Sequence, residues 1–112
     1  MLNSKYRFHS RGGVRHTYQE GKTIRTPKIS LVHNDNSRGF QRFGVVVSKK
    51  VLKSAVGRNR IRRRVYEAIR LELPNFSAKK DCLFVVYSRD IKDIPFLELR
   101  HMVKELLDAS IR

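Results

Sequence analysis

The stretch 49–70 concentrates the residues of this chain whose side chains could do chemistry. Nine of them are basic: Lys49, Lys50, Lys53, Arg58, Arg60, Arg62, Arg63, Arg64 and Arg70, against the single acid Glu67. Arginine guanidinium groups bind phosphates through parallel hydrogen bonds and stack on exposed bases. Asn59, between two arginines, offers both a donor and an acceptor to a base or sugar edge. The stretch therefore predicts binding to a nucleic acid.

The same stretch has the periodicity of a folded helix. Its apolar residues fall at i, i+4, i+7 and i+8, which predicts one buried stripe of Ile61, Val65, Ala68 and Ile69. At about 100° per residue, the polar positions divide into an outer face of Asn59, Arg60 and Arg63 and a flank row of Arg58, Arg62 and Tyr66. The pattern predicts a helix with two polar surfaces. A solvated charged face is the alternative, which the scarcity of interleaved acids disfavours.

The charge of the whole chain also indicates a polyanionic partner. Its 112 residues contain 25 Lys and Arg against 10 Asp and Glu, a net charge of +15 at pH 7. Nucleic acid is the favoured partner, and an anionic membrane surface is the weaker alternative. The sequence shows no apolar run of about 20 residues and no signal-peptide-like start, so we expect a cytoplasmic protein that does not enter a membrane.

Groupings that would support catalysis are missing from the sequence pattern. A protein nuclease needs paired carboxylates with metal ions, or histidines with a lysine, but the acids here are scattered. The four histidines lack metal-ligand spacing. The lone Cys82 opens an apolar run and is predicted to be a buried core residue. We therefore predict no catalytic residue and no metal ligand in the protein, with a protein-only nuclease as the disfavoured alternative.

Helical and extended patterns alternate around the basic stretch. A first helix is expected over about 12–20, capped by Ser10 and ended by Gly21. Strands are expected at Ile24, 29–33, 43–48 and 82–87, with 34–39 as a loop; the β-branched 43–48 strand is predicted to be central in the sheet. The basic helix should begin at an N-cap, Ser54, and end near residue 73. Pro95 should open a last helix whose stripe is Phe96, Leu99, Val103, Leu106 and Ile111.

This order predicts a single RNA-binding domain over residues 1–112. The fold class is α+β, a two-layer sandwich in the order α-β-β-β-α-β-α with helices over one mixed sheet. Side chains that could stack with a single strand lying on this sheet are Phe8, Val14, Tyr18 and Val32. Core positions are the alternative for the same residues.

The sequence resembles the protein subunit of bacterial ribonuclease P. The matching residues are Gly44, Val47, Lys49 and Lys50 at a strand end, Ala55 and Val56 in the following loop, and Arg58, Asn59, Arg60, Ile61, Arg62 and Arg63 on the basic helix. The match covers nearly the whole chain from Phe8 onward. The Arg-Asn-Arg element is short, and its position after this strand makes the combination specific.

The resemblance implies a fold, an activity and partners. The basic helix would lie in a left-handed βαβ crossover, an exception to the right-handed rule, in a ribosomal protein S5 domain 2-like fold. The protein would be a subunit of an endoribonuclease whose catalytic RNA uses Mg²⁺ to remove the 5′ leader from precursor tRNA. Its partners would be ribonuclease P RNA and precursor tRNA, with no DNA and no membrane. A structural RNA-binding protein, such as a ribosomal protein, is the alternative function.

The resemblance also assigns residues to two ligands. The catalytic RNA would contact Lys49, Lys50, Arg58, Asn59, Arg60 and Arg63. The single-stranded leader would contact Val14, Tyr18, Ser30, Val32, Val46, Arg62 and Tyr66. Three positions depart from the family pattern: Val14 stands where Phe is usual, Val32 where Tyr is frequent and Tyr66 where Arg is usual. Leader affinity or leader preference is expected to differ accordingly.

Overall fold

The computed structural model describes residues 4–7, 11–36 and 39–111, with the side chains of 5–7, 16–36 and 39–111. Ser10, the predicted cap of the first helix, and the side chain of Val14 lie outside the described part. Within that part, no helix is both long enough and apolar enough to cross a membrane.

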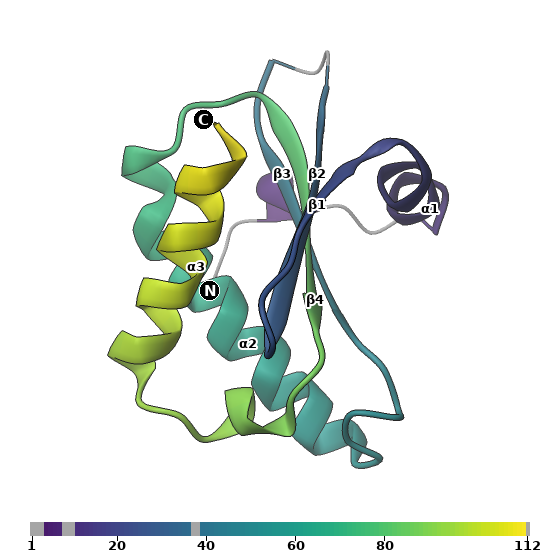
Figure 1. Cartoon of the computed structure of the whole chain (residues 1–112), viewed down its shortest axis with the longest axis vertical. Helices are drawn as coiled ribbons and strands as arrows, with labels where there is room; N and C mark the ends of the chain where they lie inside the picture. The colour runs from purple at the N-terminus through teal and green to yellow at the C-terminus, as the bar shows by residue number, and fades with distance from the viewer. Residues whose placement is uncertain (1–3, 8–10, 37–38, 112) are drawn as a thin grey trace.

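Helices cover both faces of one sheet (Figure 1). The elements are η1 (Ser4–Tyr6), α1 (Arg11–Glu20), β1 (Lys22–Ile24), β2 (Ile29–Asp35), β3 (Arg42–Val47), α2 (Ala55–Glu72), η2 (Leu73–Asn75), β4 (Lys80–Val86), η3 (Arg89–Lys92) and α3 (Phe96–Ser110). The predicted order α-β-β-β-α-β-α is confirmed. Helices α2 and α3 lie together on one face, and α1 lies alone on the other.

The four strands form a mixed sheet in the order β1-β2-β4-β3. Strand β4 is antiparallel to β2 and parallel to β3, so its predicted interior position is confirmed. The predicted central position of the 43–48 strand is wrong, because β3 is an edge strand. Its β-branched residues reflect burial against α2 rather than two strand neighbours: Val45 and Val47 belong to the core that α2 completes.

Strand β2 is longer than the sequence pattern predicts. Asn34 and Asp35, expected in a loop, continue the ladder opposite Asp81 and Lys80. The Lys80 ammonium also binds the Asp35 carboxylate at 2.7 Å. Pairing with β4 thus overrides the turn preference of these two residues.

The main core lies between the sheet and the pair α2 and α3. The predicted stripe of α2 is confirmed, since Ile61, Val65, Ala68 and Ile69 are all fully buried. Cys82 is buried in the same core, as predicted, and burial raises the pKa of its thiol. In α3, the expected Leu99, Val103 and Leu106 are buried together with Leu107. Ile111 was wrongly placed in this stripe: it follows the end of α3 and is exposed.

The ends of α2 follow the sequence signals. Ser54 is its N-cap, as predicted, and its Oγ accepts the N–H of Gly57 at 3.1 Å. At the other end, the buried Glu72 carboxylate accepts a hydrogen bond from Nε of Arg100 on α3 at 2.9 Å. The basic helix is therefore fixed both to the turn before it and to the last helix.

Candidate RNA-binding surfaces

The outer face of α2 is exposed along its length. Asn59, Arg60 and Arg63 all lie at the surface, away from the buried stripe. Among the described residues, none forms a hydrogen bond or ion pair with the Arg63 guanidinium. Arg60 is partly engaged, because its Nε donates to the Lys92 carbonyl at 3.2 Å. Arg63 is thus the freest cation of this face for a phosphate.

Two arginines of the flank row form hydrogen bonds within the protein. One terminal nitrogen of Arg58 donates to the carbonyls of Leu52 and Lys53, at 3.0 and 2.7 Å, and so holds the turn that precedes α2. Arg62 donates to Oδ1 of Asn59 at 2.8 Å, which joins the flank row to the outer face. These bonds leave the two guanidinium groups at the surface in defined positions.

Tyr66, the last member of the flank row, is half-buried beside the edge strand β3. Burial raises the pKa of its hydroxyl, while Arg7, a hydrogen bond with the Val45 backbone and Arg62 act in the opposite direction. The Arg7 guanidinium lies 5.6 Å from the centre of its ring. The structure therefore brings Arg62 and Tyr66 together at the β3 edge, with the Tyr66 ring already in contact with a cation.

Arg64, also on α2, has a structural role that the sequence pattern did not single out. Its guanidinium donates to the carbonyls of Ile91, at 2.6 Å, and Ile94. Burial, followed by repulsion from Arg60, lowers its pKa. Arg60 and Arg64 together fix η3 against α2, so the cations of η3 and α2 share one surface.

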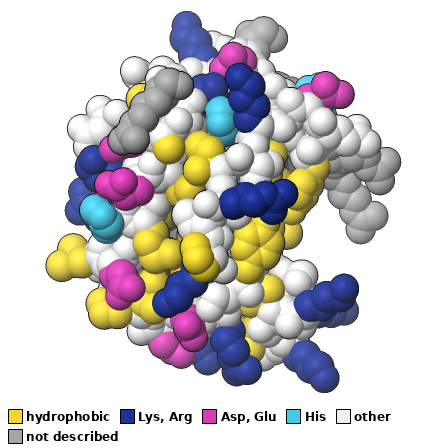
Figure 2. All heavy atoms as spheres, viewed as in Figure 1, with side chains coloured by type: hydrophobic (Ala, Val, Ile, Leu, Met, Phe, Trp, Pro, Cys, Tyr) yellow, Lys and Arg dark blue, Asp and Glu magenta, His cyan; other side chains and the backbone are white. Residues whose placement is uncertain are grey.

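Lys49 and Lys50 lie in the exposed turn between β3 and α2. Figure 2 shows Lys and Arg side chains gathered at the lower right, where this turn and the start of α2 lie, and acids mainly over α3 on the left. The acids on α3 include Glu98, Glu105 and Asp108. The turn and the start of α2 therefore carry exposed basic side chains without acids beside them in this view.

The opposite face of the sheet is apolar and shallow. Val32 and Leu83 are buried there, with Val46 and Val85 partly buried around them. Ser30 lies next to this group, opposite Val85 in the β2 and β4 register. Its side chain is fully buried, and its hydroxyl forms no hydrogen bond with any residue that the structure describes. Of the residues assigned to the leader, Ser30, Val32 and Val46 thus share one face.

Helix α1 borders this face because Gly21 lets it approach β2 closely. The Gly21 N–H donates to the Thr17 carbonyl at 2.8 Å, which closes the helix as predicted. A Cβ at Gly21 would lie 2.8 Å from Cγ1 of Val32 and 2.9 Å from the His33 carbonyl oxygen. Tyr18, one residue after the buried Thr17, is 46% exposed at the rim. Of the predicted leader residues on α1, Tyr18 is therefore at the apolar face.

A second aromatic residue that the sequence pattern did not single out stands at the same face. Tyr87 follows β4 directly and is 46% exposed. Burial, and then the charge of the Tyr87 phenol, raises the pKa of Tyr18, so the two hydroxyl groups interact. The alternation of side chains along β4 was the available signal, because Leu83, Val85 and Tyr87 are two residues apart.

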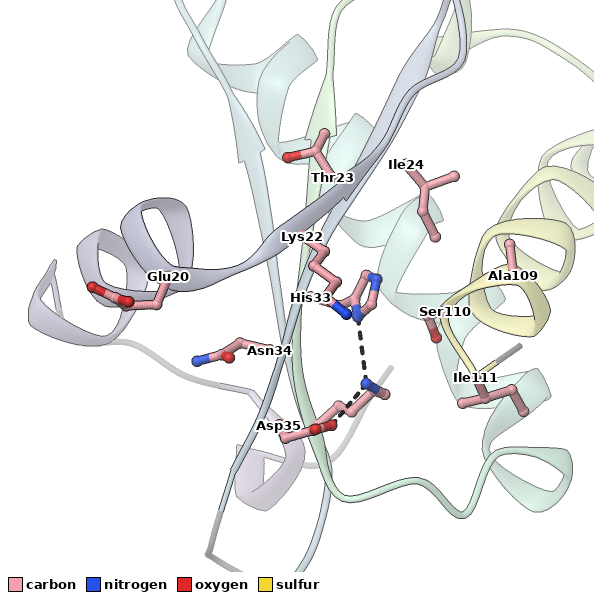
Figure 3. Close-up of a pocket in the computed structure, with 11 residues that line it drawn as sticks. Glu20, Lys22, Thr23, Ile24, His33, Asn34, Asp35, Ala109, Ser110 and Ile111 are labelled. Atoms are coloured by element: carbon pink, nitrogen blue, oxygen red, sulfur yellow. Dashed lines mark hydrogen bonds and ion pairs between the residues drawn. The ribbon is translucent and has the colours of Figure 1, made fainter.

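A polar pocket of about 600 Å³ lies at the other end of the sheet, between β1, β2 and the end of α3 (Figure 3). Lys80 reaches into it between Asp35 and His33, with its Nζ 3.4 Å from Nδ1 of His33. Glu20 and Lys22 also line the pocket, so cations and anions balance within it. This arrangement favours no single ligand charge.

The described residues do not offer a site for the Mg²⁺ that the resemblance implies. In residues 4–7, 11–36 and 39–111, no three His, Cys, Asp or Glu side chains form a group that could hold a metal ion. The acids near the basic surface are used elsewhere: Glu67 pairs with Arg70 and Glu72 with Arg100. We therefore assign no step to a protein-bound metal.

The fold and charge define a class, that of small and strongly basic α+β proteins with a mixed four-stranded sheet. The sequence model of the family described as Ribonuclease P matches residues 2–110. The chain is similar to the ribonuclease P protein component of Chloroflexus aurantiacus, with 39% identity over 106 residues, 95% of this chain and 78% of the relative. That of Roseiflexus castenholzii is 35% identical over 109 residues, 97% of this chain and 88% of the relative.

A solved structure supports the fold. The ribonuclease P protein from Thermotoga maritima superposes with a TM-score of 0.82 at 23% identity, over 92% of this chain and 96% of that chain. The chain belongs to the bacterial ribonuclease P protein family. It is accordingly a subunit of an endoribonuclease, takes part in the 5′ processing of precursor tRNA and associates with ribonuclease P RNA.

Proposed function

We propose that this chain is one RNA-binding domain that holds two different RNAs on two different surfaces. The catalytic RNA binds the outer face of α2 and the turn that carries Lys49 and Lys50. The 5′ leader of precursor tRNA binds the apolar sheet face beside α1. The observation that carries this proposal is the separation of an exposed basic surface from an apolar one, which holds a buried hydroxyl that no described residue binds.

The chemistry of the outer face suits a folded RNA. Exposed guanidinium groups on a rigid helix bind phosphates without the entropy cost of ordering a tail. Arg63 has no competing partner among the described residues, and Arg60 keeps part of its guanidinium at the surface. Asn59 is held by Arg62, which orients its amide. This side is expected to show the steep salt dependence of phosphate contacts.

The apolar face suits a single strand. Unpaired bases stack on aromatic side chains and lie against small apolar ones, whereas a duplex hides its bases. Val32 and Val46 belong to one apolar cluster that forms the floor of this face, and the half-exposed Tyr18 lies beside it. Arg62 and Tyr66, at the β3 edge, lie between this floor and the outer face, where a leader would pass toward the catalytic RNA.

We further propose that catalysis and its Mg²⁺ belong to the RNA subunit, in the cytoplasm. The scattered acids and the paired Glu67 and Glu72 support this division, since each of those two carboxylates is already bound by an arginine. The protein then contributes affinity for the leader and for the catalytic RNA. Its positive charge offsets phosphate repulsion between two RNAs.

Reconstitution tests the proposal. The purified protein is combined with ribonuclease P RNA at low Mg²⁺, and cleavage of precursor tRNA is measured with and without the protein. Stimulation that requires the RNA subunit is expected, and no stimulation across several leaders would contradict the proposal. Cleavage by the protein alone would indicate a protein-only nuclease, and copurification with ribosomal subunits would indicate a ribosomal protein.

A further inference from the structure

Tyr87 extends the apolar sheet face beyond the last residue of β4. Its backbone N–H donates to the Lys28 carbonyl at 2.9 Å, so the ladder between β2 and β4 continues through it. Side chains alternate along a strand, which places Tyr87 on the face of Leu83 and Val85. Leu83 is fully buried there, whereas Tyr87 is half-exposed. The ring therefore stands at the border of the face rather than in its floor.

Tyr18 approaches the same border from α1. The helix packs against β2 and β4, and its Thr17 is fully buried while Tyr18 remains half-exposed. Burial, and then the charge of the Tyr87 phenol, raises the pKa of Tyr18, which agrees with the two side chains lying on the same face of the sheet. Two half-exposed rings from different elements thus border one patch of the sheet.

The floor next to the two rings contains a polar group that no described residue binds. Ser30 lies opposite Val85 in the pairing of β2 with β4, and Tyr87 follows Val85 by two residues. Its hydroxyl is buried and makes no hydrogen bond with a described residue. A buried unpaired hydroxyl lowers stability, and pairing it with a bound base would require the side chains that cover it to move aside.

We propose that Tyr18 and Tyr87 form a clamp that holds one unpaired base of the 5′ leader, with Ser30 beneath it. The inference rests on the proposed function and adds a residue, Tyr87, and a ligand unit, a single nucleobase. A base fits this place better than an apolar peptide does, because the chain carries +15 and its partner is an RNA. Two rings stack on any base, and a purine offers them the larger surface.

The test uses the holoenzyme reconstituted from this protein and ribonuclease P RNA. Affinity is measured for precursor tRNA with a long leader, for the same tRNA without a leader, and for a series of leaders with one abasic position each. The variants are Tyr87→Ala, Tyr87→Phe and Tyr18→Ala. Leu97→Ala is the matched control, since Leu97 is a large exposed apolar residue on α3.

We expect Tyr87→Ala and Tyr18→Ala each to weaken long-leader binding roughly fivefold or more, because each removes one stacking surface. Leaderless tRNA should bind within about twofold of wild type, and Tyr87→Phe should keep most of the leader affinity. The same abasic position should remove the effect of both alanine variants. 2-Aminopurine at that position should be quenched by the wild type and less by either variant.

The clamp is overturned if Tyr87→Ala, like the control Leu97→Ala, binds long-leader precursor tRNA with wild-type affinity. Different abasic positions for Tyr18 and Tyr87 would overturn it as well. If the wild type itself does not distinguish long-leader from leaderless tRNA, the proposed leader function fails instead. Thermal unfolding of each variant separates a lost contact from a lost fold, and Tyr87→Leu, which removes the ring but keeps an apolar side chain, serves where Tyr87→Ala does not fold.

Discussion

The Arg42 guanidinium binds both oxygens of the Asp81 carboxylate, with Nε 2.9 Å from Oδ1 and Nη2 2.8 Å from Oδ2. Both side chains are largely buried at the point where β3 and β4 begin. Asn36 donates to the same carboxylate at 2.9 Å, so the loop after β2 is fixed to the same group. One acid on β4 therefore holds both the start of β3 and the loop that precedes it, 39 and 45 residues earlier in the chain.

Replacing Asp81 by alanine should destabilise the fold strongly. The variant removes the carboxylate that binds the buried Arg42 cation, and breaking a buried pair in this way costs roughly 3–5 kcal/mol. Chemical denaturation of the protein alone measures the change. The control is Asp90→Ala, since Asp90 forms an exposed pair with Lys28 at 3.6 Å and should cost less than about 1 kcal/mol. Similar small losses in both variants would contradict the role given to Asp81.

Arg63→Ala should weaken binding to the catalytic RNA without unfolding the protein. A lost phosphate contact should reduce the slope of log affinity against log salt by roughly 0.7–0.9. Arg70→Ala is the matched control on the same helix, because Nε of Arg70 already donates to Glu67 at 2.8 Å. Salt titrations of RNA binding measure both variants. Equal slopes for Arg63→Ala and wild type would remove Arg63 from the interface.

Gly21→Ala should push α1 away from the sheet. The added carbon would lie 2.5 Å from the Thr17 carbonyl oxygen and 2.9 Å from that of His33, and backbone atoms cannot yield as a flexible side chain does. We expect a loss of about 1–3 kcal/mol and weaker leader binding. Gly39→Ala is the control: nothing lies within 4 Å of its added carbon, and only the φ of +82° is unfavourable. Leader affinity should be unchanged in that control.

His33 should make stability depend on pH. Burial, and then the charges of Lys80 and Lys22, lower its pKa, while Asp35 acts in the opposite direction. The unfolded chain therefore binds this proton more readily, so the stabilisation is complete above roughly pH 6.5 and declines as the pH falls below it. The unfolding temperature should drop between about pH 7.5 and pH 5.5, and His33→Gln should drop less. Parallel curves would contradict this assignment.

The sequence predicted the helical parts of the molecule well because capping and periodicity are local. Ser54 alone indicated where α2 begins, and the stripe that contains Ile61 separated buried from exposed arginines. The place of β3 in the sheet could not be predicted this way, because a β-branched residue such as Val45 suits an edge strand and a central strand equally. Sheet order depends on contacts between distant segments, which a local pattern does not record.

The distinction between local patterns and contacts of distant segments also applies to the candidate surfaces. The outer face of α2 followed from spacing, because Arg63 and its neighbours share one helix. Tyr87 was not singled out, because the face it borders is formed by α1, β2 and β4 together. The roles of Arg58 and Arg64 in holding backbone carbonyls were also hidden, since a guanidinium directed at a loop and one directed at a phosphate have the same sequence signature.

Strand β4 lies between β2 and β3 although it follows both of them in the chain. During synthesis, β2 and β3 therefore leave the ribosome before β4, the strand that lies between them. The arginines of α2 also leave before β4, because α2 precedes it in the chain. Completing the sheet requires pairing between distant segments, which makes folding a late event. A nascent chain of this protein thus presents the cations of α2 before β4 can complete the sheet.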